Sequence, residues 1–453
     1  MKQTETHTNK HVLRVILAAA AVLLFCGALS GAASAATEIH TVADLTTELA
    51  KDNFDIILGD NTDDGSAHPN VYKLTDMITI ITSGKLDLNG KVLQQTSPNT
   101  RIFRLNAALT MELTDSNPAA KHYFSKDAAT GLYKYEGESP ADGPIEVDGG
   151  CITGGNITEI SESGNGGGVW ISYQDVTLIM RGGNVVGNMA VDSSSHECKG
   201  GGIYDGGRFE LKGGQIIGNY ADRGAGLQVN VTRSAIMEGG VIAYNSTYND
   251  PEYTTNGGGV YVDGTFTMTG GIIKGNSSAR YGGGIYVYGT FILEGGTIAS
   301  NSAALNGGGV CVNTDGVAHG QFTMTGGVIG GDAESDGNTA DQYGGGLFLG
   351  NVAEPPVIIS GGVIKNNTAH EGGGIYTLGQ LMLEPANGKE ILIDSNRSAV
   401  GTGGIIHDTG AVSSTVVDQL IPAKEQTPAT PAPFIGILAG LGAAAGLFSL
   451  RRK

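Results

Sequence analysis

The residues best suited to chemistry form a short acidic turn followed by a histidine. Asn313, Thr314 and Asp315 precede Gly316, and His319 follows in the same turn. A carboxylate and an imidazole are suited to acid–base work, but cleavage of a glycosidic bond needs two carboxyl groups that face each other across that bond. Residues this close in one turn do not converge on one bond, and no paired aspartates follow one repeat downstream. We therefore expect no catalytic residues here.

A second acidic turn, DNTDDG at residues 60–65, is a candidate cation site. Asp60 and Asp64 offer carboxylates, but the distal glutamate of a calcium loop is missing. Other charged side chains, such as Glu210, Lys212 and Glu238, are scattered along the chain. We expect a solvated acidic surface with no metal and no cofactor.

One set of aromatic side chains is better suited to binding. Each follows an apolar residue after a glycine cluster, and the set comprises Trp170, Tyr204, Tyr261, Tyr286, Phe348 and Tyr376. If successive copies stack about 4.8 Å apart, these outward rings suit offset stacking and form a stripe that faces sugar rings or a partner surface. The alternative is that aromatic residues simply favour strands and the repeat has been copied.

These rings belong to a repeated phrase, of which GGGIYVYGTFILEGGTIASNSA at residues 282–303 is one copy. Triple-glycine phrases or close variants start at residues 166, 200, 224, 257, 282, 307, 344 and 372. A period of this size indicates a solenoid. Each copy divides into three short strands separated by glycine corners and shows no helical periodicity, so the pattern predicts an all-β, single-stranded parallel β-helix.

An asparagine recurs after the third strand of the copies. The set comprises Asn188, Asn219, Asn245, Asn276, Asn301 and Asn367, and Asn396 follows in a weaker copy. Stacked side-chain amides can hydrogen-bond from coil to coil, so we expect a structural asparagine ladder. One copy has Asp332 at this spacing, and the ladder is expected to falter there.

The two ends of the chain predict export and anchoring. Residues 1–35 have the basic, apolar and small-residue regions of a signal peptide. Residues 36–110 are expected to form a cap helix and the first coils, residues 111–144 a hairpin-like insertion, and residues 145–410 the repeat β-helix. Residues 411–433 form a Pro/Thr/Ala linker, and residues 434–453 a transmembrane or sorting helix with a basic, cytoplasmic tail. The expected location is the cell surface.

Charge and cysteine content limit the partners. The formal net charge is −18, which disfavours binding to nucleic acid or an anionic membrane surface. Cys151, Cys198 and Cys311 remain after the signal peptide, and no CxxC pair occurs. This pattern predicts neither a disulfide framework nor a zinc site, with a Cys151–Cys198 bridge as the alternative.

The phrase GGGIY followed by FTMTGG and an isoleucine–asparagine turn resembles adhesin-like surface proteins of methanogenic archaea and gut bacteria. It is also similar to the polymorphic outer-membrane repeats of bacterial surface proteins. The resemblance covers roughly residues 145–405. It implies a right-handed, pectate-lyase-like β-helix on an archaeal or other single-membrane cell, which binds glycans or partner surfaces without catalysis. Two alternatives remain: a polysaccharide lyase or hydrolase of the same fold, and a passive envelope component.

Overall fold

The computed structural model describes residues 35–63, 69–159, 164–192, 194–249, 255–312, 320–350, 357–386, 388–401, 403–407 and 412–414. The chain divides into residues 1–37 and residues 38–453, and the fold below is that of the second unit. The expected signal peptide, the C-terminal segment and the Asp315–His319 turn lie outside the described residues. Within the described ranges, no helix is long and apolar enough to span a membrane.

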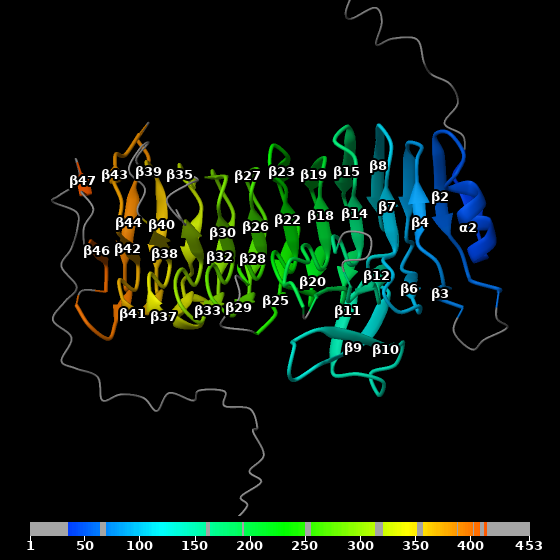
Figure 1. Cartoon of the computed structure of the whole chain (residues 1–453), viewed down its shortest axis with the longest axis horizontal. Coiled ribbons are helices and arrows are strands. Elements are labelled where there is room, and N and C mark those ends of the chain that lie inside the picture. The colour runs from blue at the N-terminus through cyan, green and yellow to red at the C-terminus, as the bar shows by residue number, and fades with distance from the viewer. Residues whose placement is uncertain are drawn as a thin grey trace, which may run out of the picture. The chain divides into compact units, whose positions relative to one another are not determined.

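Stacked coils of the chain build four long sheets that run side by side along the second unit (Figure 1). Sheet A contains β1 (Thr37–Ile39), β2 (Phe54–Leu58), β5 (Gly84–Asp87), β8 (Leu109–Thr114), β15 (Val176–Met180), β19 (Arg208–Leu211), β23 (Ser234–Met237), β27 (Thr265–Met268), β31 (Thr290–Leu293), β35 (Gln321–Met324), β39 (Val357–Ile359), β43 (Leu381–Leu383) and β47 (Val412–Ser414). Sheet B contains β3 (Val71–Leu74), β6 (Val92–Gln95), β12 (Cys151–Thr153), β16 (Asn184–Val186), β20 (Gln215–Ile217), β24 (Val241–Ala243), β28 (Ile272–Lys274), β32 (Thr297–Ala299), β36 (Val328–Gly330), β40 (Gly362–Lys365) and β44 (Ile391–Asp394).

The other two long sheets complete each coil. Sheet C contains β4 (Ile78–Ile80), β7 (Phe103–Leu105), β14 (Val169–Ile171), β18 (Ile203–Asp205), β22 (Leu227–Val229), β26 (Val260–Val262), β30 (Ile285–Val287), β34 (Val310–Val312), β38 (Leu347–Leu349), β42 (Ile375–Thr377) and β46 (Ile405–His407). Sheet D contains β13 (Asn156–Ile157), β17 (Met189–Ala190), β21 (Tyr220–Ala221), β25 (Ser246–Thr247), β29 (Ser277–Ser278), β33 (Ser302–Ala303), β37 (Thr339–Tyr343), β41 (Thr368–Glu371) and β45 (Arg397–Ser398).

Each repeat visits sheets C, A, B and D in that order, and its strands pair in parallel with those of the next repeat. The predicted all-β architecture of stacked parallel coils is therefore confirmed. The sequence predicted three strands per coil, whereas the structure adds the short strand of sheet D after the asparagine. In most coils this strand has only two residues, too few to produce a periodic hydrophobic pattern.

Identical side chains stack in columns inside the coils. The rings of Phe266, Phe291 and Phe322 are nearly parallel, with successive centroids 5.5 and 5.3 Å apart. These phenylalanines belong to one continuous core that also contains the stacked isoleucines of sheet B. The glycine clusters let the coils approach: a Cβ on Gly284 would lie 2.6 Å from the carbonyl oxygen of Gly309 in the next coil. Only glycine fits where two backbones come this close.

A short helix, α2 (Val42–Glu48), covers the end of the rod next to β2 (Figure 1). Thr41 caps it by accepting a hydrogen bond from the backbone N–H of Asp44 at 3.0 Å. Leu45 and Leu49 are buried in the core of the coils. This helix is the predicted cap, and it protects the first coil from solvent, as the ends of solenoids require.

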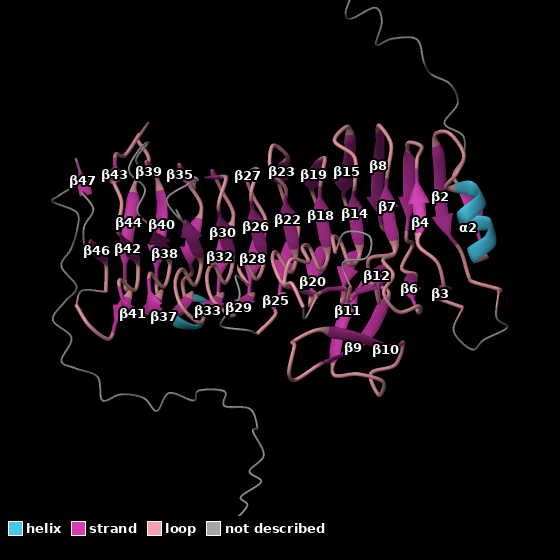
Figure 2. Cartoon of the chain, viewed as in Figure 1, coloured by secondary structure: helices cyan, strands magenta, loops and turns pink. Residues whose placement is uncertain are grey.

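One excursion leaves the coils between sheets A and B and forms a small antiparallel sheet on the side of the rod (Figure 2). Its strands are β9 (Lys121–Lys126), β10 (Tyr133–Gly137) and β11 (Ile145–Asp148), in the order β10-β9-β11. The excursion thus has three strands and reaches residue 148, whereas the expected insertion ended at residue 144. Residues 111–114 belong to β8 of sheet A.

Candidate binding surfaces

Sheet C brings the predicted aromatic residues into one column. Trp170 pairs with Tyr204, Tyr261 with Tyr286, and Phe348 with Tyr376, with Gln228 and Cys311 filling the remaining positions. The rings of Tyr261 and Tyr286 have centroids 4.9 Å apart, and those of Phe348 and Tyr376 are 5.9 Å apart. The spacing expected from stacked coils is therefore present.

We expected this column to be open to solvent, but a second row of side chains covers it. Tyr204, Tyr261, Tyr286, Phe348 and Tyr376 are only 3–8% exposed. The covering residues come from positions just before the triple glycines: Tyr281 stacks on Tyr286 with centroids 6.4 Å apart, and Tyr343 lies 4.5 Å from Tyr376. These rings form a satellite cluster outside the main core. Little ring face is left for a sugar.

Trp170, at the start of the column, is half-buried and has two cations over its ring. The guanidinium carbons of Arg101 and Arg104 each lie 4.5 Å from the ring centroid. Such cation–π contacts stabilise both partners. We therefore assign Trp170 a packing role at this position.

The asparagines form a continuous, buried ladder. The side-chain oxygen of Asn276 accepts hydrogen bonds from the backbone N–H and the side-chain amide of Asn245, both near 3.0 Å. Its own amide donates to the carbonyl oxygen of Ile242 and to the side chain of Asn301. The same pattern links Asn188, Asn219, Asn245, Asn276, Asn301, Asn338, Asn367 and Asn396.

The sequence predicted that the ladder falters at Asp332, and this prediction is wrong. Asn338 takes the ladder position in that coil. Asn338 accepts from Asn301 at 2.9 Å and donates to Asn367 at 2.9 Å. Asp332 lies in a loop that leaves the coil between β36 and β37 and contains a short 3₁₀ turn, η2 (Glu334–Asp336). Six extra residues are thereby looped out, and the buried hydrogen bonds are kept.

Asp205 and Asp222 are fully buried, although sequence analysis did not select them. Asp205 points into the core from β18, where neighbouring coils have Ile171 and Val229. Burial raises the pKa of its carboxyl group to about 7, and one of its oxygens has no hydrogen-bond partner. Burial also raises the pKa of Asp222 to about 6, and its carboxylate lies 3.6 Å from the ring of His196. Enclosed groups cannot reach a polymeric substrate, so we read both as structural.

The cysteines are equally enclosed. Cys151, Cys198 and Cys311 are free and buried, so the alternative Cys151–Cys198 bridge is absent. Burial raises the pKa of the Cys198 thiol to about 12, which removes the thiolate needed for nucleophilic attack. Among the residues that the structure describes, no group of three or more His, Cys, Asp or Glu side chains is arranged to hold a metal ion.

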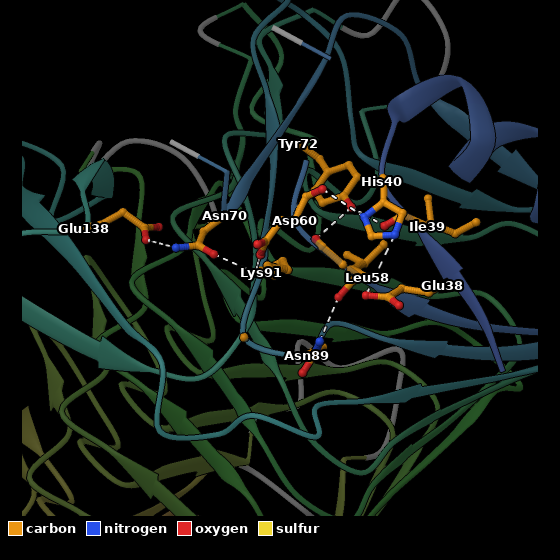
Figure 3. A network of polar contacts seen from close by, with 12 residues as sticks. Glu38, Ile39, His40, Leu58, Asp60, Asn70, Tyr72, Asn89, Lys91 and Glu138 are labelled. Carbon is orange, nitrogen blue, oxygen red and sulfur yellow. Dashed lines mark hydrogen bonds and ion pairs between the residues drawn. The ribbon is translucent and has the colours of Figure 1, made fainter. Parts of the chain in front are cut away.

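A polar network fixes the excursion to the first coils (Figure 3). Lys91 donates to Asp60 and to the side-chain oxygen of Asn70, both at 2.6 Å, and Asn70 donates to Glu138 after β10. Glu138 also contacts the buried ring of His122 on β9 at 3.1 Å. Lys91 holds the pKa of Asp60 below its ordinary value. The Asp60 carboxylate is thus engaged by a lysine, whereas Asp64 lies outside the described residues.

Where the tip of the excursion reaches sheets B and D, it encloses a groove. Tyr133 seats its ring on Gly218, where a Cβ would lie 2.2 Å from the ring, and its N–H donates to the Gly218 carbonyl at 2.9 Å. Its ring is nearly parallel to that of Tyr244, with centroids 6.5 Å apart and an interplanar angle of 19°. Sequence reasoning missed this pair because the two tyrosines come from distant segments.

The groove has a volume of about 440 Å³, within the range of small-molecule sites, roughly 300–1,000 Å³. It is lined by Thr130 and Lys126 of the excursion and by Ser246, Asn249 and Ser277 of the coils. Tyr244 forms one side of it and is 41% exposed. The groove thus combines one open ring with several hydroxyl and amide groups.

Comparison with protein-family models, curated proteins and solved structures finds no match to this chain. Inferences about its function therefore depend on its own geometry.

Proposed function

We propose that this chain is an adhesin-like surface protein, in which the β-helix is a non-catalytic rod that binds glycans or a partner surface. One observation carries the proposal: the antiparallel excursion docks on the side of the coils and leaves a preformed groove of about 440 Å³ beneath its tip. A passive coat component does not need such an excursion, because the stacked coils are complete without it.

The ends of the chain and its charge support a surface location. Residues 1–35 have the composition of a signal peptide, and residues 434–453 that of a membrane or sorting segment. Between them lies an acidic β-structure of stacked parallel coils, and we propose that the coils are right-handed, the hand that parallel crossovers almost always adopt. We propose that the C-terminal segment tethers the rod to the membrane and that the rod extends outward.

Screening the full chain tests this proposal. The purified protein is labelled and applied to an array of neutral and acidic glycans and to immobilised surface proteins, and the glycans are then checked for chain cleavage. We expect saturable binding to a subset of the array with no cleavage. Absence of any binding would support a passive envelope component, and shortened glycans would support the lyase or hydrolase alternative.

A further inference from the structure

Tyr244 occupies a corner where the backbone disfavours a large side chain. The residue immediately before each ladder asparagine turns the chain out of sheet B, and most of these residues have positive φ. They are Gly187, Gly218, Tyr244, Gly275, Ser300, Asn366 and Ser395, with φ between 53 and 63°. Glycine adopts this conformation freely and asparagine more readily than most residues, whereas a bulky side chain there is an outlier. Within the described residues, Tyr244 is the one large side chain at these corners, which points to a functional reason.

The ring of Tyr244 is held flat along the outside of the coils. A Cβ on Gly275, at the corner of the next coil, would lie 2.6 Å from the ring, so the absence of a side chain there creates its seat. On the other side, the Tyr133 ring stacks beside it at 6.5 Å and 19°. Two nearly parallel rings therefore lie across neighbouring corners, and that of Tyr133 is buried while that of Tyr244 is exposed.

Several of the other groups around the ring are small and polar. Ser246, Ser277 and Asn249 line the groove from the coils, and Thr130 lines it from the excursion. Ser246 also donates a hydrogen bond to the Thr130 carbonyl oxygen, which fixes the excursion tip against β25. Hydroxyl and amide groups both donate and accept hydrogen bonds. Neutral groups of this kind suit a ligand that itself carries several hydroxyl groups.

The composition of the groove disfavours other occupants. Apart from Tyr244, the apolar side chains that line its described part are alanines: Ala128, Ala129, Ala279 and Ala304. A protein partner needs a pocket that buries a large apolar or aromatic anchor, and these small side chains provide none. A polyanion needs several cations, but among the described lining residues Lys126 is the only one.

We propose that this groove binds one ring of a saccharide chain, with the sugar stacked on the open face of Tyr244 and its hydroxyl groups bonded to Ser246, Ser277 and Asn249. The negative face of an aromatic ring attracts the C–H groups on one face of a sugar, and the flanking groups bind its polar edge. This inference rests on the proposed binding function and names its site and ligand class.

The test compares variants of the full chain for binding to defined oligosaccharides. The probes are cello-, manno-, galacto- and galacturono-oligomers, titrated by calorimetry. Tyr244→Gly introduces the residue found at neighbouring corners, so we expect it to fold with an unchanged or higher melting temperature and to bind at least tenfold more weakly. Tyr244→Phe keeps the ring and should bind within about threefold of the wild type.

Tyr173 provides the matched control, because it is a similarly exposed tyrosine, 43%, in the turn between β14 and β15. Tyr173→Ala should leave binding unchanged. Undiminished binding by Tyr244→Gly would overturn the groove assignment while leaving the general binding function intact. Binding to a surface protein but to none of the oligomers would overturn the saccharide assignment. A protein that binds nothing would remove the proposed function as well.

Discussion

The pH dependence of the free energy of unfolding, compared with and without the Asp205 carboxyl group, measures how strongly the core of the coils disfavours a charge. The side chain of Asp205 occupies an inward position of β18, is fully buried, and accepts one hydrogen bond, from the backbone N–H of Gly207 at 3.0 Å. Burial is the main cause that raises the pKa of this carboxyl group to about 7, and the nearby Arg233 and Arg208 offset only part of that effect. Replacing Asp205 with asparagine removes the charge and keeps the shape.

The direction of the effect follows from proton binding. In the unfolded chain this carboxyl group has an ordinary pKa of about 3.9, so between pH 4 and pH 7 the folded state holds a proton that the unfolded state has released. The free energy of unfolding therefore falls as the pH rises through this window. A difference of about three pKa units corresponds to about 4 kcal/mol. We expect Asp205→Asn to be only about 1 kcal/mol more stable than the wild type at pH 4.5 and about 4 kcal/mol more stable at pH 8.5.

Urea unfolding at several pH values measures this difference. The difference in urea midpoint between the wild type and Asp205→Asn should grow as the pH rises. The slope m should be the same in both proteins, because m reports the surface exposed on unfolding. Asp175→Asn is the control, since Asp175 is an exposed aspartate in the turn between β14 and β15, and it should follow the wild type at every pH. If Asp205→Asn differs from the wild type by the same amount at pH 4.5 and pH 8.5, the carboxylate does not experience the core and the reasoning is refuted.

Three further perturbations test the stacking itself. Asn276→Ala leaves buried backbone and amide groups of the ladder without partners, so thermal unfolding should show a loss of about 3 kcal/mol or more of stability. The control Thr267→Ala, on the outward face of β27, should cost little. Equal losses for the two variants would contradict the ladder. Gly284→Ala places a Cβ 2.6 Å from the next coil and should cost at least about 2 kcal/mol. Gly404→Ala meets no described residue within 4 Å and should be neutral. Similar melting temperatures for the two variants would refute close coil contact. The native protein should leave the thiols of Cys151, Cys198 and Cys311 unreactive toward a disulfide reagent until it unfolds, because burial raises their pKa values; rapid labelling would show that the coils open.

The sequence predicts the coils well because the same short strand pattern recurs in each copy and equivalent residues of successive copies contact each other. The spacing between Phe266, Phe291 and Phe322 follows the strand period, and the structure stacks these rings as expected. The register of the aromatic column follows from the same spacing. Its burial does not, because the covering rings of Tyr281 and Tyr343 lie outside the strand pattern.

Other features depend on contacts between segments that the repeat spacing does not relate to each other. Tyr133 and Tyr244 meet only because the excursion folds back onto coils that are formed much later in the chain. The ladder position of Asn338 is missed because counting from the preceding glycines reaches Asp332, and the intervening loop is invisible to a fixed spacing. Asp205 stands out only when the copies are aligned, as a carboxylate in a column of apolar residues.

The unbroken ladder has a consequence for how such a chain can vary. Successive ladder asparagines are 25 residues apart between Asn276 and Asn301 and 37 apart between Asn301 and Asn338, yet both steps use the same buried hydrogen bonds. Six of the twelve added residues lie at the corner between β36 and Asn338. Chain length at this corner is therefore uncoupled from the architecture of the rod. Foreign peptides could be grafted between Gly331 and Gly337 for display, and natural selection could diversify the outer loops of such proteins without having to redesign their interior.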